Sequence, residues 1–346
     1  MEKQKGKASV LFENPPLVLA AASVVGKKEG EGPLGEYFDR IEVDPMLGKK
    51  TWEQAESELQ TRTTSLVIEK SGLKKEDIRY YFGGDLLAQL IATSFSVMDM
   101  EFPMFGIYGA CSTMGEAMGL GSMVVDGGFA DHIVVTASSH FASAEKQFRF
   151  PLEYANQRPK SATWTVTGSG AFLLTSEEKM KEWKVSPLAK ITGITTGKIV
   201  DFGIKDSMNM GAAMAPAALS TIRAHFDDLG TCAEDFDLIV TGDLGQLGKE
   251  VLLAAAQREG INLGGKLADC GTMVFDILKQ DVHSGGSGCG CSAITLCGEL
   301  LNELNTGKLS RILFCGTGAL LSPTSTQQGL PIPGVCHAIS ISGGDV

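Results

Sequence analysis

The chain has 346 residues, of which 43% are hydrophobic, and its formal net charge is -11. This size is enough for about two domains with a substantial core. The acidity argues against nucleic-acid binding, because no run of lysine or arginine offsets it. The eight cysteines include no CxxC pair, and Cys289 and Cys291 are too close together for zinc knuckles, so we expect no metal and no cofactor.

The N-terminal third alternates apolar runs with amphipathic segments. In chain order we predict a core strand over 17–25, an amphipathic helix over 51–70, a strand over 78–83 and a helix over 86–98. No stretch reaches the roughly 18 consecutive apolar residues that a bilayer span needs. Any contact with a membrane is therefore expected to be peripheral, without a transmembrane segment.

The segment 102–140 places Cys111 where a strand turns into a helix. Residues 102–108 predict a short buried strand, Gly109 and Ala110 a tight bend, and 112–125 a buried helix. Backbone N–H groups at such a helix start favour negative charge, either a thiolate on Cys111 or the carboxylate of a ligand. A strand over 132–137 follows.

The second half of the chain repeats motifs of the first. Residues 141–163 lose periodicity and predict a surface excursion or lid, after which a glycine-punctuated strand over 165–174 precedes the midpoint. Gly84-Asp85-Leu86 recurs as Gly242-Asp243-Leu244, and Cys111-Ser112 recurs as Cys291-Ser292. We therefore predict one α/β unit repeated over 1–180 and 181–346. The helices 112–125 and 292–305 would pack together between two sheets, in five layers (αβαβα).

Four motifs resemble the thiolase fold and its condensing enzymes. They are ACS at Cys111, TVTGSGAFLL at 165–174, GSGCGCSA at 286–293 and GTGALLS at 316–322, which are similar to glycine-rich motifs of ketoacyl synthase III. The resemblance implies that Cys111 occupies the acylated-cysteine position. The synthases add a histidine, and an asparagine or second histidine, where this sequence has Gly242 or Asp243, and Ser287 or Gly290. These positions offer no imidazole, and His283 is the nearest candidate to replace it.

A narrower resemblance runs nearly end to end. GPLG at 32–35, GDLL at 84–87, YGACST at 108–113, EKQFRFPLEY at 145–154, MAPAA at 214–218, GGSGCGCSA at 285–293 and GALLSPTSTQQ at 318–328 resemble the stage V sporulation protein AD family of spore-forming bacteria. The resemblance implies binding of dipicolinic acid (pyridine-2,6-dicarboxylate), with or without calcium, and a role in its uptake into the developing spore. It also implies membrane subunits as partners at the spore inner membrane. A homodimer is expected, with the strand 132–137 pairing across the two-fold axis.

The ligand is expected in the former acyl pocket of a thiolase-fold pseudoenzyme. The residues expected to line it are Asp85, Cys111, Ser112, Ser138, Ser139, His140, Arg149, Asp243, Ser287 and Cys289. Several alternatives stay open. Cys111 either lines the pocket, or acts as the acyl-carrying nucleophile of an acyltransferase or condensing enzyme, or is an inert buried thiol. Asp85 and Asp243 either cap helices or line the cavity, where one would pair with an arginine or meet a calcium ion.

Overall fold

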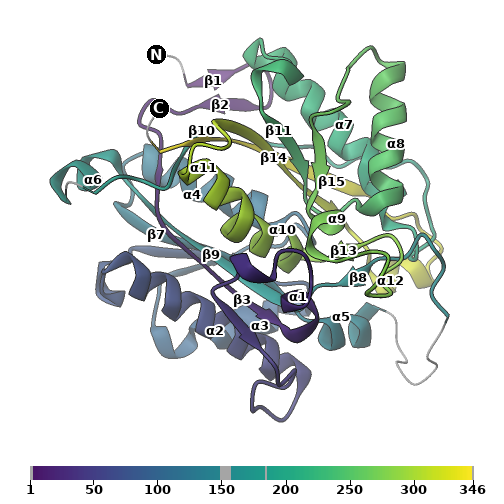
Figure 1. Cartoon of the computed structure of the whole chain (residues 1–346), viewed down its shortest axis with the longest axis horizontal. Coiled ribbons are helices and arrows are strands. Elements are labelled where there is room, and N and C mark those ends of the chain that lie inside the picture. Colours follow the sequence, from purple (N-terminus) through teal and green to yellow (C-terminus); the bar gives the residue numbers. More distant parts are fainter. Residues whose placement is uncertain (1–2, 149–156, 184, 345–346) are drawn as a thin grey trace.

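The computed structural model describes residues 3–148, 157–183 and 185–344 (Figure 1). The elements up to the midpoint are β1 (Gln4–Lys5), β2 (Ser9–Leu11), β3 (Leu17–Gly26), α1 (Lys27–Gly30), β4 (Arg40–Glu42), α2 (Trp52–Ser71), β5 (Tyr80–Gly84), α3 (Ile91–Val97), β6 (Met104–Gly106), α4 (Thr113–Asp126), β7 (His132–Ser139), α5 (Phe141–Phe148), β8 (Trp164–Thr165), β9 (Gly168–Thr175) and α6 (Glu177–Trp183).

The elements after the midpoint are β10 (Ala189–Thr195), α7 (Met210–Leu229), β11 (Leu238–Thr241), α8 (Gly245–Arg258), β12 (Leu267–Asp269), α9 (Cys270–Val274), β13 (Gly286–Ser287), α10 (Cys289–Thr295), α11 (Leu301–Asn305), β14 (Arg311–Ala319), α12 (Pro323–Gln327) and β15 (Gly334–Gly343). Short 3-10 turns span Gly35–Tyr37, Lys75–Asp77, Ala88–Leu90, Met98–Met100 and Ala233–Asp235, and a π turn (Leu296–Leu300) joins α10 to α11.

The strands repeat one order in the two parts of the chain. The first part has the order β6-β5-β7-β9-β3 and the second has β12-β11-β14-β15-β10. In both, the first two pairings are parallel and the last two are antiparallel. The two parts meet where β3 pairs with β10 through two residue pairs. The α/β prediction is confirmed.

Helices α4 and α10 lie in the middle of the molecule, between the two groups of strands (Figure 1). Met114 and Met118 of α4 and Ile294 of α10 are fully buried in one shared core. Separate apolar clusters join α2 to one outer face and α7 with α8 to the other. The order of layers is therefore helix, strands, helix, strands, helix, as the sequence predicts.

Three local predictions differ from the structure. The strand expected to be buried over 102–108 is the edge strand β6, where Phe105 is 50% exposed because only β5 pairs with it. The helix expected from residue 86 begins only at Ile91, because Gln89 and Leu90 take positive φ angles. The excursion expected from residue 141 begins with the helix α5.

The predicted pairing of the strand 132–137 across a two-fold axis is wrong. This strand is β7, and it lies between β5 and β9, which occupy both of its edges. A strand with both edges paired has no backbone groups left for a second chain. The free edge in this part of the sheet belongs to β6.

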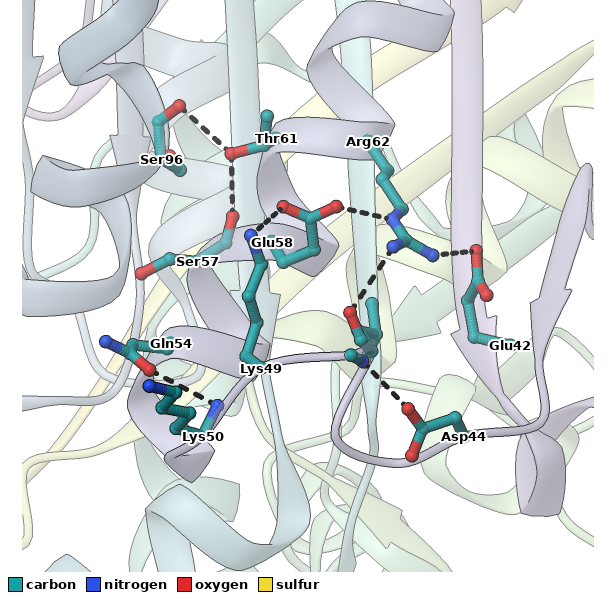
Figure 2. A network of polar contacts seen from close by, with 12 residues as sticks. Glu42, Asp44, Lys49, Lys50, Gln54, Ser57, Glu58, Thr61, Arg62 and Ser96 are labelled. Atoms are coloured by element: carbon teal, nitrogen blue, oxygen red, sulfur yellow. Dashed lines mark hydrogen bonds and ion pairs between the residues drawn. The ribbon is translucent and has the colours of Figure 1, made fainter.

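An ion-pair network fixes the loop before α2 (Figure 2). Arg62 bonds Glu42 and Glu58, each at 2.8 Å, and Lys49 pairs with Glu58 at 3.0 Å. Arg62 also donates to the carbonyl of Leu47 at 3.4 Å. The network joins β4, the loop and α2, and so sets the position of the loop that covers the N-terminal end of α2.

A buried carboxyl holds α2 against β7 without a positive partner. The Glu56 carboxyl accepts hydrogen bonds from Ser138 at 3.1 Å and from Ser143 at 2.5 Å. Burial, together with the nearby carboxyl of Asp85, raises the pKa of Glu56 to about 8. The neutral, protonated form is therefore the one that this site favours at neutral pH.

We predict that this acid makes the fold less stable in alkali. Its pKa is higher in the folded chain than the ordinary 4.5, so the folded state binds more protons, and the free energy of unfolding falls as pH rises from about 5 to about 8. Glu56→Gln should reduce that fall by at least about 1 kcal/mol, as measured by urea unfolding across this range. The exposed Glu36→Gln is the control, and an unchanged pH dependence in Glu56→Gln would contradict the assignment.

Candidate functional site

Cys111 lies in a tight bend at the start of α4, as the sequence predicts. Ala110 has a φ of 51°, and the N–H of Ser112 donates to the carbonyl of Gly109 at 3.1 Å. A Cβ at Gly318 of β14 would lie 2.3 Å from that same carbonyl oxygen. Glycine at 318 therefore lets β14 approach the bend and bury Cys111, which is 5% exposed.

The carboxyl of Asp243 interacts with the buried thiol of Cys111. Burial and the negative field of Asp243 raise the pKa of Cys111 well above its ordinary value of 9.0. Reactive cysteines need the opposite, a pKa lowered by a cation, an imidazole or a helix N-terminus. At neutral pH Cys111 is therefore a thiol, which is a poor nucleophile.

Neutral donors hold the carboxyl of Asp243. Gly288 donates its backbone N–H to one oxygen at 2.9 Å, and Thr317 donates its hydroxyl to the other at 2.9 Å. Burial raises the pKa of Asp243 to about 7 despite these bonds. Asp243 thus changes between its neutral and charged forms near neutrality.

The repeated aspartates Asp85 and Asp243 have different partners. Asp85 accepts the N–H of Leu87 and both the N–H and the hydroxyl of Thr93, at 2.6–2.8 Å. It therefore has the capping role, and its predicted place in the pocket is not supported. In the second half of the chain, Asp269 accepts the N–H groups of the turn after Asp243. The carboxyl of Asp243 is therefore not needed to cap that turn and can interact with Cys111.

The serines predicted for the pocket mostly bond to backbone. Ser112 donates to the carbonyl of Gly109 at 2.6 Å, and Ser139 donates to that of Val166 at 2.7 Å. Ser138 bonds Glu56, and its own carbonyl accepts the thiol of Cys289 at 2.8 Å. Ser138, Ser139 and Cys289 therefore hold the start of α10 against β7, and Ser112 fixes the bend before α4.

His140 points away from Cys111. Its Nδ1 accepts the N–H of Ala142, so Nε2 carries the proton and donates to the carbonyl of Pro45 at 2.8 Å. The other histidines also bond elsewhere: His132 to Thr175, His225 to Thr195, His283 to Pro159 and Asp281, and His337 to Gly197. None of the chain's five histidines bonds to Cys111, and His283 does not replace the missing base.

The helix starts supply fewer free N–H groups than the sequence suggests. At α10, the N–H of Gly288 goes to Asp243 and that of Gly290 goes to Ser139. At α4, the N–H groups of Ser112 and Thr113 go to carbonyls of the preceding bend. An anion in this cavity would therefore rely mainly on side-chain donors.

A cavity opens beside Cys111 and Ser287. Its empty space, part of which is open to solvent, is about 420 Å³. Its other lining residues are Leu86, Tyr108, Ala110, Ala144, Phe148, Thr165, Met210, Gly288, Ala319 and Leu321. Apolar side chains form most of the wall, and Tyr108, Thr165 and Ser287 supply hydroxyl groups.

Of the ten predicted site residues, Cys111 and Ser287 line this cavity, and Asp243 interacts with Cys111 without being part of the lining. Arg149 lies outside the described residues, so its role stays a prediction. Lys146, three residues earlier in the chain, pairs with Glu53 at 2.6 Å. Sequence reasoning missed Tyr108 and Thr165, although both lie within quoted motifs, YGACST and TVTGSGAFLL.

Solved structures with similar folds are thiolase-like enzymes. Acetyl-CoA acetyltransferase from Syntrophomonas wolfei matches with a TM-score of 0.64 and 12% identity, over 95% of this chain and 99% of that one. OleA of Xanthomonas campestris bound with cerulenin gives 0.63 and 16%, over 96% and 97%. The 3-oxoacyl-[acyl-carrier-protein] synthase III of Aquifex aeolicus gives 0.55 and 13%, over 94% and 99%. At these identities the likeness shows the fold alone.

Sequence comparison is more specific. A curated relative, the stage V sporulation protein AD of Bacillus subtilis (strain 168), is 41% identical over 337 residues, which are 97% of each chain. The family model for stage V sporulation protein AD matches residues 6–342. The chain therefore belongs to the stage V sporulation protein AD family and carries a thiolase-like fold.

Proposed function

We propose that this sporulation-family protein binds dipicolinic acid in the cavity beside Cys111 without transforming it, and so acts in dipicolinate uptake into the developing spore. The observation that carries the proposal is the contact between Cys111 and Asp243. Asp243 interacts with Cys111, whereas none of the chain's five histidines bonds to it, and burial together with the negative charge of Asp243 raises the pKa of the thiol. The cavity therefore suits binding better than acyl transfer.

The lining suits a small aromatic diacid. Leu86, Phe148 and Met210 offer apolar surface to a pyridine ring, and the hydroxyls of Tyr108, Thr165 and Ser287 can donate to carboxylates. Among the described residues no cluster of three or more His, Cys, Asp or Glu side chains could hold a metal ion. Calcium therefore enters the proposal only as a companion of the ligand.

Location and partners follow from the family resemblance and are also proposals. In the described part of the chain, no helix combines the length and apolar character of a membrane span. We propose a peripheral position on the inner membrane of the developing spore, where other membrane subunits of the same complex would hold the protein.

Calorimetric titration with pyridine-2,6-dicarboxylate tests the proposed function. We expect saturable binding at one site per chain, and Cys111→Trp should abolish it because the indole would fill the cavity. Cys111→Ser, which keeps the volume, is the matched control and should still bind. Thermal unfolding of both variants verifies that they fold.

The alternative is an acyltransferase with Cys111 as nucleophile, which its place at the start of α4 favours. Mass spectrometry after incubation with acyl-coenzyme A distinguishes the two functions. We expect no adduct on Cys111. A stable thioester on Cys111, with turnover and without dipicolinate binding, would establish the enzyme and refute the binder.

We also propose a homodimer, now through the free edge of β6. Phe105 of this edge strand is 50% exposed, and an exposed aromatic side chain on a free strand edge suits pairing with a second chain. Light scattering should give the mass of two 36.6 kDa chains. Phe105→Arg should shift it toward one chain, whereas Leu278→Arg, on an exposed loop residue, should not. A one-chain mass for the unaltered protein would refute the dimer.

A further inference from the structure

The turn that follows β5 carries part of the cavity wall and has a strained backbone. Its residue Leu86 lines the cavity and is 7% exposed. Gln89 and Leu90, at the end of the same turn, have φ angles of 56° and 52°. Residues with a side chain adopt this left-handed region rarely, because Cβ then crowds the backbone. The turn therefore needs contacts with the rest of the fold to keep its shape.

Helix α5 carries another part of the cavity wall. Ala144 and Phe148 line the cavity, and because they are four residues apart they lie on one face of the helix. Gln147 is three residues after Ala144 and so belongs to the same face. Leu86 and Ala144 are buried in one apolar cluster, against which Phe148 packs. The position of the turn beside α5 therefore shapes this part of the cavity.

Other elements fix α5 in place. Ser143 donates its hydroxyl to Glu56 of α2 at 2.5 Å. The N–H of Phe141 donates to the hydroxyl of Thr167 at 3.1 Å. Of the two parts of the wall, α5 is therefore the anchored one, and the turn is the one that has to be positioned against it.

The side-chain amide of Gln147 joins the turn to α5. Its Oε1 accepts the N–H of Ala88 at 2.9 Å, and its Nε2 donates to the carbonyl of Leu86 at 3.2 Å. A primary amide offers an acceptor and a donor side by side, so it pairs with the turn as a peptide group would. Gln147 is not part of the cavity lining. Any effect that it has on a ligand must therefore pass through the wall residues that it holds.

We propose, on the basis of the proposed function, that Gln147 is a positioning residue for the ligand. Its two hydrogen bonds hold the turn that carries Leu86 beside the face of α5 that carries Ala144 and Phe148. Without these bonds the turn relaxes toward ordinary φ angles, and the cavity is no longer formed in advance. The ligand then has to restore the shape of the turn on binding, which lowers its affinity.

Calorimetric titration of Gln147→Met with pyridine-2,6-dicarboxylate tests the positioning role. This variant keeps the length of the side chain and loses both hydrogen bonds. We expect the affinity to fall about three- to tenfold, through faster dissociation in a stopped-flow experiment. Gln147→Glu, which keeps the acceptor and lacks the donor, should also bind more weakly. Gln54→Met is the matched control and should bind normally, because Gln54 also accepts a backbone N–H, that of Lys50, but lies outside the cavity lining.

Two further measurements separate positioning from a purely structural role. Hydrogen exchange of residues 85–90, followed by mass spectrometry, should be slowed by the ligand in the unaltered protein and should be faster in Gln147→Met without ligand. Gln89→Asn should restore part of the affinity of Gln147→Met, because asparagine adopts positive φ angles more readily than glutamine does.

Equal affinity and equal dissociation rate in Gln147→Met and the unaltered protein would overturn the positioning role and leave the binding function standing. A lower unfolding temperature of Gln147→Met with unchanged binding would also overturn it, since Gln147 would then only stabilise the fold. Absence of binding to the unaltered protein would refute the binding function itself, and the positioning role with it.

Discussion

The thiol of Cys111 and the carboxyl of Asp243 lie together beneath the cavity, and the packing of the two halves shields both from water. Burial disfavours the ionised form of both groups, and the negative charge of Asp243 further opposes ionisation of the Cys111 thiol. A thiolase-like fold that places an imidazole here would favour a thiolate. In this chain Cys111 interacts with a carboxyl instead, which together with burial raises the pKa of its thiol.

The rest of the structure serves to hold this pair. Glycine at 318 lets β14 approach the bend that carries Cys111, and glycine at 288 lets the start of α10 approach Ser139 and Thr165. Asp269 takes over the capping of the turn after Asp243, while Ser138 and Ser139 anchor the start of α10 to β7. The acids of the interior are held by hydroxyl and N–H donors. Burial raises the pKa of Asp243 to about 7 and that of Glu56 to about 8 in spite of these bonds, so the stability of the fold is expected to weaken in alkali.

The repeat, the layer order and the place of Cys111 could be predicted from the sequence, because they follow from motif spacing, apolar periodicity and the chemistry of helix starts. The partners of Asp85 and Asp243 could not. The two residues occupy the same local motif, and only the tertiary position of Asp269 decides that one caps a turn while the other faces a thiol. The edge position of β6 was missed for a similar reason, since an apolar run does not reveal whether one or two strands pair with it.

The account depends on Cys111 being a protonated thiol at neutral pH, and site-resolved alkylation measures this most directly. Iodoacetamide would be reacted with the folded protein from pH 6 to 10, and modification of each cysteine would be followed by mass spectrometry. The account predicts that Cys111 stays unmodified at pH 7 and that its reaction rate rises only above the ordinary cysteine pKa of 9.0. Selective modification of Cys111 at pH 7, faster than that of the exposed Cys232, would show a thiolate and contradict it.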